Sequence, residues 1–426
     1  MGMTVAEELF TRKNTEAQPV KAGDFVDARI DGVMISHRNL VKIDQHVKKS
    51  GKLGGLPRIW DLDKVYTFSD HFQPASTADY AWYDKAQRLL AKKMNLKHFY
   101  DAEAGICHQM MCDYGHVRPG ELIIGTDSHT VLYGALNAGG TGMGEADTSY
   151  ALVFGELWFQ VPPTVKITLR GSLPSYPVAR DVILYLAGRY GDDFAQYKAI
   201  EYTGEAAQAL SVDGRMCLAD YAVEVGGKFG FFSCDQKTVD YVASKTSLPY
   251  EPIEADADTG YEREFEADVS QIGFQVAKPH RFQNVGPVSE AAGTRIDQAV
   301  IGACSNGRFE DIEMAARMLK GSKVSPDVRF IISPGSWTVY RQCLDAGLIP
   351  TLLDGGAQFI QPGCSICQGL QGYLTDGDVC ITAATRNYEG RLGSTKAEVY
   401  LGGPATVAAA AIAGRIVDPR EVLNDL

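Results

Sequence analysis

Three of the nine cysteines lie in glycine-containing loops after apolar runs, where thiolates can bind a metal. Cys364 and Cys367 form a C-x-x-C pattern after QFIQ, and Cys304 follows DQAVIGA. The C-x-x-C pattern lets two thiolates face one metal centre, and a neighbouring loop can supply the third. Three thiolates suit a cubane iron–sulfur cluster in which one iron stays open and acts as a Lewis acid. A redox pair or half of a zinc site remains an alternative on spacing alone, although no second C-x-x-C or C-x-x-H supplies a fourth zinc ligand.

The other cysteines lie mostly in apolar stretches, and we expect most of them to be buried free thiols. They are Cys107, Cys112, Cys217, Cys234, Cys343 and Cys380.

Four short stretches concentrate groups that could transfer protons, as removal of water from a substrate requires. A carboxylate beside an imidazole raises the imidazole pKa and fixes its tautomer. Taken singly, each of these histidines is more often structural than functional, and we expect His46, His98, His116 and His280 to be solvated or structural. The candidates are Asp70 and His71 in FSDHFQP, His108 in GICHQM, Asp127, Ser128 and His129 in IIGTDSHT, and Glu224 in YAVEVGG.

The turn TRNYEGR contains Arg386 and Arg391 with a glycine between them. Paired guanidinium groups at such a turn suit two-point binding of carboxylates. A surface turn with two solvated arginines is the alternative.

Strands and helices that alternate along the sequence are expected to position these residues. From residue 297 onward, apolar runs that predict strands alternate with loops and with stretches of helical spacing such as FEDIEMAARMLKG and WTVYRQCLDAG. This alternation is typical of a parallel α/β domain, in which ligands bind at the carboxyl ends of the strands.

The chain has 426 residues and a formal charge of −12, from 41 basic and 53 acidic side chains. This charge argues against a protein that coats nucleic acid. The N-terminal stretch lacks the apolar core of a secretory signal, and no run is long enough to span a membrane. We therefore expect a cytoplasmic protein in which cysteine groups serve metal binding or catalysis.

Two changes in composition and periodicity along the sequence predict the domain boundaries. VPPTVKITLRG opens a new β-rich stretch near residue 162, and residues 247–290 are acidic and weakly periodic, as in a surface connection. We predict domains at residues 1–162, 163–287 and 288–426.

In this order, the segments GICHQ, PGELIIGTDSHT, GTGMGEAD, IGACSNGRFED, PGCSICQG and RNYEGR resemble the aconitase / 3-isopropylmalate dehydratase superfamily. The resemblance implies three α/β/α domains of the aconitase large-subunit type around a [4Fe–4S] site. Cys304, Cys364 and Cys367 would ligate the cluster.

The resemblance also implies roles for the other candidates. Asp70 and His71 would assist departure of a hydroxyl, Asp127 would pair with His108, and Glu224 with His129. Arg386 and Arg391 would hold carboxylates, with Ser128 also contacting substrate.

The implied reaction is that of a hydro-lyase on a small hydroxy di- or tricarboxylate. A 3-isopropylmalate dehydratase-like enzyme of amino-acid biosynthesis leads on base rate. Homoaconitate hydratase, 2,3-dimethylmalate dehydratase, methylmalate or citraconate dehydratase and a specialised biosynthetic relative remain alternatives. A non-catalytic RNA-binding or metal-binding regulatory protein is the alternative from another class.

Three positions depart from the family pattern around the expected substrate pocket. Asp220 and Thr385 stand where asparagine is usual, and Arg38 follows His37 where the family often has an acid. We expect Thr385, His37 and Arg38 to contact substrate, and we take Thr385 and Asp220 as the mark of a substrate other than isopropylmalate.

The sequence ends just past the third expected domain. Full-size aconitases continue into a swivelling domain with a Ser-Ser-Arg loop that carries the carbon base. The resemblance therefore implies a separate small subunit with that domain, without which this chain would not turn over substrate.

Overall fold

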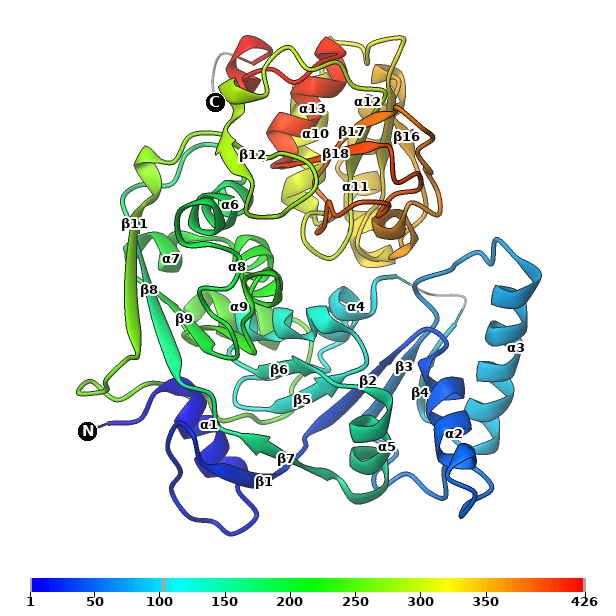
Figure 1. Ribbon diagram of the computed structural model, residues 1–426, viewed down its shortest axis with the longest axis vertical. Coiled ribbons are helices and arrows are strands. Elements are labelled where there is room, and N and C mark those ends of the chain that lie inside the picture. The colour runs from blue at the N-terminus through cyan, green and yellow to red at the C-terminus, as the bar shows by residue number, and fades with distance from the viewer. Residues whose placement is uncertain (1, 102–104, 424–426) are drawn as a thin grey trace. The chain divides into compact units, whose positions relative to one another are not determined.

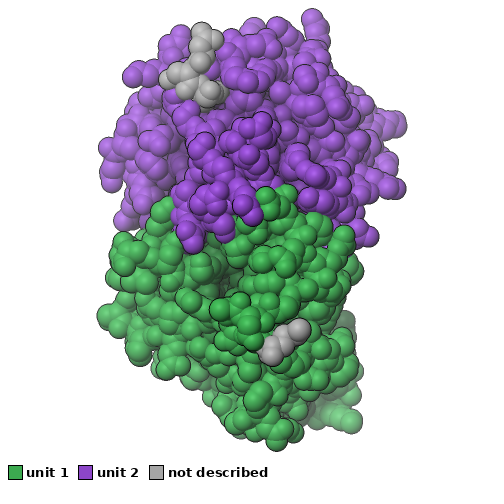
Figure 2. All heavy atoms as spheres, turned by 90° about the vertical axis from the view of Figure 1, so that its left-hand side faces the viewer, with its two compact units in different colours: residues 1–168, 195–203, 226–266 green, residues 169–194, 204–225, 267–426 purple. Residues whose placement is uncertain are grey.

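The computed structural model describes residues 2–101 and 105–423. The chain forms two compact units, each built from segments far apart in the sequence (Figure 2). Unit 1 comprises residues 1–168, 195–203 and 226–266, and unit 2 comprises residues 169–194, 204–225 and 267–426. The division into three domains at residues 162 and 287 remains a prediction.

A five-stranded sheet with the order β4-β3-β2-β5-β6 forms the centre of unit 1, and all its neighbouring strands are parallel (Figure 1). Strands β2, β3 and β5 are buried at every position, as expected of strands covered on both faces. The strands are β2 (Gly32–Ser36), β3 (Val65–Phe68), β4 (His98–Tyr100), β5 (Leu122–Gly125) and β6 (Gly139–Gly142).

Helices and two smaller sheets complete unit 1. Helix α2 packs on β2 and contacts α3 and α5. The helices are α1 (Val5–Lys13), α2 (Asn39–Lys49), α3 (Ala78–Lys93), α4 (Cys107–Asp113), η1 (Ser128–Leu136), α5 (Glu145–Phe154) and α9 (Gln236–Ala243). The smaller sheets are β1 (Phe25–Arg29) with β7 (Glu156–Gln160), and β10 (Phe229–Phe232), β9 (Ala199–Thr203), β8 (Thr164–Arg170) and β11 (Arg263–Asp268), whose last two strands extend into unit 2.

A seven-stranded sheet with the order β13-β12-β18-β17-β14-β15-β16 forms the centre of unit 2. The strands from β18 to β16 are parallel, whereas β12 runs antiparallel to both neighbours. The strands are β12 (Gln275–Ala277), β13 (Val285–Pro287), β14 (Gln298–Ile301), β15 (Arg329–Ile332), β16 (Gln358–Phe359), β17 (Val379–Thr382) and β18 (Glu398–Gly402).

The helices of unit 2 enclose an apolar core that includes Ile301, Phe330 and Ala409. Helix α10 contacts α11, α12 and α13. The helices are α6 (Ala179–Tyr190), α7 (Glu205–Ala209), α8 (Val212–Asp220), α10 (Phe309–Leu319), α11 (Trp337–Asp345), α12 (Leu348–Gly355) and α13 (Pro404–Ala413), with short 3₁₀ turns η2 (Val223–Val225), η3 (Val269–Gln271), η4 (Val288–Glu290), η5 (Ser365–Gln368) and η6 (Pro419–Glu421).

These sheets confirm the predicted α/β class. The prediction that residues 247–290 form only a surface connection is wrong in part. The stretch 247–290 contains strands β11, β12 and β13. They are only three to six residues long and attach at or near sheet margins, so they leave little periodic signal. Within the described part of the chain, no helix is both long and apolar enough to span a membrane.

Candidate functional site

The loops after β2, β3 and β5 lie at one edge of the unit 1 sheet, because the carboxyl ends of parallel strands share an edge. They carry His37 and Arg38, Asp70 and His71, and Asp127 to His129, respectively. Helix α4 adds His108. The fold thus gathers five predicted residues from three segments, and we call Asp70, His71, His108, Asp127 and His129 the histidine–aspartate network.

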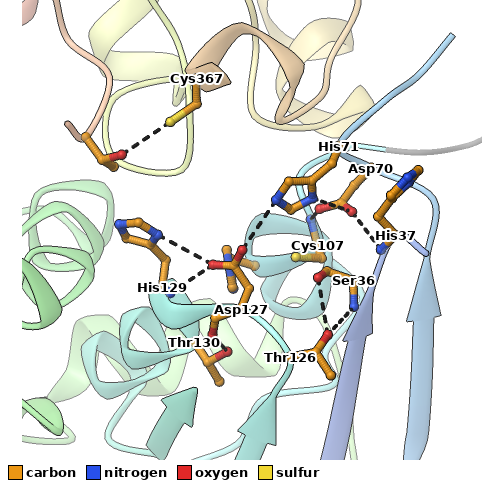
Figure 3. A network of polar contacts seen from close by, with 12 residues as sticks. Ser36, His37, Asp70, His71, Cys107, Thr126, Asp127, His129, Thr130 and Cys367 are labelled. Atoms are coloured by element: carbon orange, nitrogen blue, oxygen red, sulfur yellow. Dashed lines mark hydrogen bonds and ion pairs between the residues drawn. The ribbon is translucent and has the colours of Figure 1, made fainter. Parts of the chain in front are cut away.

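The Asp127 carboxylate is the hub of this network (Figure 3). Its Oδ1 lies 2.9 Å from Nε2 of His108 and 3.5 Å from Nδ1 of His129, and its Oδ2 lies 3.3 Å from Nε2 of His71. Asp127 also caps η1 by accepting the backbone N–H of His129 at 2.9 Å. One carboxylate therefore orients three imidazoles.

Asp70 holds the other side of His71. Its Oδ1 lies 2.9 Å from Nδ1 of His71, so His71 stands between two carboxylates (Figure 3). The backbone N–H groups of His37 and Cys107 donate to the fully buried Asp70 carboxylate at 3.1 and 3.2 Å. An imidazole that faces carboxylates at both nitrogens satisfies both contacts only when both nitrogens carry protons.

Both carboxylates stay ionised in this environment. Burial alone would raise the pKa of Asp127, but hydrogen bonds from His108, His129 and His71 hold it well below its usual range. Burial would likewise raise the pKa of Asp70, yet the positive charge and hydrogen bond of His71 and the Cys107 N–H lower it. The network therefore offers fixed anions beside exchangeable imidazole protons.

The remaining predicted residues of unit 1 lie around this network. His37 is buried, its backbone is left-handed with φ 36°, and burial lowers its pKa to about 3. Arg38 precedes α2, and its guanidinium lies over the Phe72 and Tyr83 rings. Ser128 is the first residue of η1, directly after Asp127.

In unit 2, the predicted cysteines lie in loops after β14 and β16. Cys304, Cys364 and Cys367 are 4, 7 and 3% exposed, and none of them forms a disulfide. A methyl group built on Gly302 would lie 3.3 Å from the Ile366 side chain, so the two loops are in contact. The fold thus places the three thiols at the carboxyl ends of the parallel strands of this sheet.

A buried arginine fixes the Cys304 loop. Arg308 donates to the carbonyl oxygens of Cys304 and Ser305, and Ser305 Oγ donates to the Ala383 carbonyl at 2.9 Å. The Asp311 carboxylate accepts the backbone N–H of Arg308 at 3.0 Å, which also caps α10. These bonds satisfy the backbone of a loop that has no regular secondary structure of its own.

The turn after β17 reaches the C-x-x-C loop. Oγ1 of Thr385 lies 3.2 Å from Sγ of Cys367, and Nη2 of Arg391 lies 3.0 Å from the same sulfur. A hydroxyl and a guanidinium at this distance favour the thiolate form, which binds metals. Thr385, which we predicted to contact substrate, thus contacts a predicted metal ligand.

Glu224 and Arg386 form an ion pair within unit 2, with 2.6 Å between Oε1 and Nε. The predicted pairing of Glu224 with His129 remains a prediction. Asp220 ends α8 and is fully buried.

Three residues that position the site escaped sequence reasoning. Arg308 and Arg180 are buried arginines, and Arg180 donates to the carbonyls of Ala383 and Ala384 just before Thr385. Thr126 joins two site loops, because its hydroxyl accepts the Ser36 N–H at 2.9 Å. The asparagine–glycine–arginine run after Cys304 could have pointed to Arg308, but the sequence contains no comparable pattern for Arg180 or Thr126.

Comparisons with known proteins agree with this arrangement. The model of the Aconitase family (aconitate hydratase) matches residues 69–414. A 3-isopropylmalate dehydratase large subunit 1 of Methanopyrus kandleri is 42% identical over 424 residues, covering 99% of this chain and 100% of that protein. A 3-isopropylmalate dehydratase large subunit of Moorella thermoacetica is 40% identical over 426 residues, covering 100% of both.

Among solved structures, Thermococcus kodakaraensis aconitase X in its holo-form superposes with a TM-score of 0.50 at 13% identity, covering 93% of this chain and 94% of that chain. This likeness supports the fold. The family match and the full-length relatives show that the chain belongs to the aconitase family, and the predicted hydro-lyase class is confirmed.

Membership of the family implies an iron–sulfur cluster. The residues fit such a group, because three buried thiols lie in two contacting loops at one sheet edge and Arg391 places a cation beside one of them. Thiolate sulfur is the ligand that iron–sulfur clusters use most.

Proposed function

We propose that this chain is the large subunit of a [4Fe–4S]-dependent hydro-lyase acting on a small hydroxy di- or tricarboxylate, with isopropylmalate as the leading substrate. The observation that carries the proposal is the placement of the Asp70 and Asp127 carboxylates on either side of the His71 imidazole, in a chain that matches 3-isopropylmalate dehydratase large subunits over its whole length. Cys304, Cys364 and Cys367 would hold the cluster, which supplies an open iron as a Lewis acid for the substrate hydroxyl.

The histidine–aspartate network would supply the proton for the leaving hydroxyl. His71 would donate from Nε2, while Asp70 at Nδ1 holds the ring and stabilises its charge. Asp127 would keep His108 and His129 oriented in the pocket, and Ser128 would contact the substrate.

Arginines would bind the substrate's carboxylates. Arg386 and Arg391 have the planar donor fork that matches a carboxylate, and Glu224 holds Arg386 in place. Asp220 and Thr385 would shape the pocket, and the whole-length match to 3-isopropylmalate dehydratase large subunits favours isopropylmalate over the other substrates that these two positions suggested.

A small subunit would complete the enzyme. The relatives are named large subunits, which implies a partner chain. We propose that this partner carries the swivelling domain, its Ser-Ser-Arg loop and the base that removes the carbon-bound proton, and that the complex works in the cytoplasm.

The test is dehydration of isopropylmalate by the complex with its small subunit, prepared without oxygen and followed by absorbance of the alkene product. His71→Gln should lower kcat by about a hundredfold or more, because it removes the proton donor. The matched control His46→Gln changes an exposed histidine of α2 and should keep the wild-type rate. An inactive wild-type complex with an intact cluster, or full activity of His71→Gln, would contradict the proposal.

A further inference from the structure

A pocket of unit 1 lies next to the segments that carry the histidine–aspartate network, and the proposed function gives it no role. Its volume is about 630 Å³, and it lies between Arg38 at the start of α2 and the first turns of α3. Its lining residues are Arg38, Thr77, Asp79, Tyr80, Trp82 and Tyr83.

Arg38 gives this pocket an available cation. Its guanidinium lies 5.3 Å from the centre of the Phe72 ring and 5.6 Å from that of Tyr83. Among the described residues, Arg38 forms no ion pair with a carboxylate. Aromatic faces hold a guanidinium in place and leave its N–H edge available for a planar anion.

The backbone around Arg38 strengthens the positive potential. Arg38 is the N-cap of α2 and makes no side-chain capping bond, and α2 has no acid in its own first turn to offset the partial positive charge of that helix end. Asp79 is the one acidic lining residue. It is exposed in the first turn of α3, where the positive end of that helix offsets its charge.

Contacts of neighbouring residues also connect the pocket to the proposed catalytic residues. His37, the residue before Arg38, donates its backbone N–H to Asp70, which holds His71. Phe72, the residue after His71, stacks on Tyr80 of the pocket wall with 3.9 Å between ring centres. The left-handed backbone of His37 is strain of the kind that persists where surrounding contacts fix a functional loop.

From this geometry we propose that the Arg38 pocket is a carboxylate-binding subsite that receives an acidic group of the substrate. The inference rests on the proposed function, since it extends the same site. Arg38 is then a binding and specificity residue, in addition to the two arginines of unit 2.

The test measures binding rather than turnover. Trp82 lines the pocket and is 52% exposed, so its fluorescence reports on occupancy. The full-length chain is titrated with succinate, and with dimethyl succinate as the uncharged match, by fluorescence and by calorimetry. We expect succinate to bind and to change the fluorescence, the ester to bind far more weakly, and Trp82→Phe to lose the signal but retain the calorimetric binding.

Arg38→Gln should weaken succinate binding about tenfold or more, the size expected for loss of a charged hydrogen bond. Arg38→Lys should recover only part of the affinity, because it lacks the planar fork. The control Arg58→Gln removes another guanidinium that lies over a ring, that of Phe154, outside the pocket, and should bind as wild type.

Equal succinate affinity of Arg38→Gln and Arg58→Gln would overturn the subsite. Sulfate that binds as tightly as succinate and displaces it would also overturn it, since the pocket would then hold any anion. Failure of the proposed function has a different result: the complete enzyme would not dehydrate isopropylmalate, while the Arg38-dependent binding of succinate would persist.

Discussion

At the scale of single residues, Asp127 is the group on which the histidine–aspartate network depends. Its carboxylate contacts three imidazoles, and hydrogen bonds from them lower its pKa in spite of burial. Asp127→Asn replaces one acceptor oxygen with a donor and removes the charge that orients these rings. We expect kcat to fall about a hundredfold or more while the circular dichroism spectrum stays unchanged.

The control for this variant is Asp63→Asn. Asp63 is a surface carboxylate with its own ion pair to Lys97 at 2.6 Å, and its loss should leave kcat unchanged. If Asp127→Asn kept more than half of the wild-type kcat, Asp127 would be structural.

Sequence reasoning found most of these residues but not all their partners. The pairs Asp70–His71 and Asp127–His108 follow the expected combinations, because neighbours in sequence and short family motifs carry that information. The contact of Thr385 with Cys367 and the ion pair of Glu224 with Arg386 did not follow from the sequence. These contacts join residues up to 162 positions apart, and a single sequence does not indicate which distant residues will be in contact.

At the scale of elements, Arg308 joins the Cys304 loop to the start of α10. It is 1% exposed, and its guanidinium donates to two loop carbonyls. Arg308→Met would remove the donors to those carbonyls and the positive charge beside the buried acid Asp311, at a cost of about 2–4 kcal/mol. Chemical denaturation should show this loss in the free energy of unfolding.

Arg317→Met is the matched control, because Arg317 is half-buried further along α10 and donates to one carbonyl at 3.4 Å. Its loss should cost under about 1 kcal/mol. Equal stability of Arg308→Met and wild type would contradict the assigned role.

Helix α6 contains a buried acid near its start. Burial raises the pKa of Asp181, in its first turn, to about 7, although the carboxylate accepts the Gln275 N–H at 2.7 Å. An unfolded aspartate titrates near about 3.9. Between these values the folded chain keeps a proton that the unfolded chain releases, so the free energy of unfolding falls as pH rises from about 4 to about 7.

Asp181→Asn removes this titration and retains a carbonyl acceptor for Gln275. Denaturation at several pH values should show that the free energy of unfolding declines less in this variant than in wild type between about pH 4 and about pH 7. These limits are the unfolded and folded pKa values of Asp181. The exposed Asp345→Asn should leave the wild-type slope in place. An unchanged slope in Asp181→Asn would show that Asp181 is ionised over this range.

The alternation of elements was largely predictable. Helices α10 and α11 and strands β14, β15 and β17 follow apolar runs and helical spacing directly. Strands β11, β12 and β13 were missed, because short marginal strands depend on pairing with distant partners such as β18.

At the scale of the whole molecule, unit 1 carries the histidine–aspartate network and unit 2 carries the cysteines. The base for the carbon-bound proton is proposed to reside on the small subunit. The isolated chain with a reconstituted cluster should therefore turn over isopropylmalate at under about 1% of the rate of the complex, the loss expected without a general base. Titration with the small subunit should restore the rate to saturation, and normal turnover by the chain alone would contradict the split.

We propose that Cys304, Cys364 and Cys367 hold the iron–sulfur cluster. The most direct measurement is iron and sulfide content, with the visible spectrum, of anaerobically prepared wild type, Cys304→Ser, Cys364→Ser and Cys367→Ser. Cys234→Ser, at a half-buried cysteine of unit 1, is the control. We predict a brown protein with about four irons and four sulfides per chain in wild type and Cys234→Ser, and a marked loss in each of the other three. Wild-type content in any of those three variants, or a colourless protein with stoichiometric zinc, would contradict the claim.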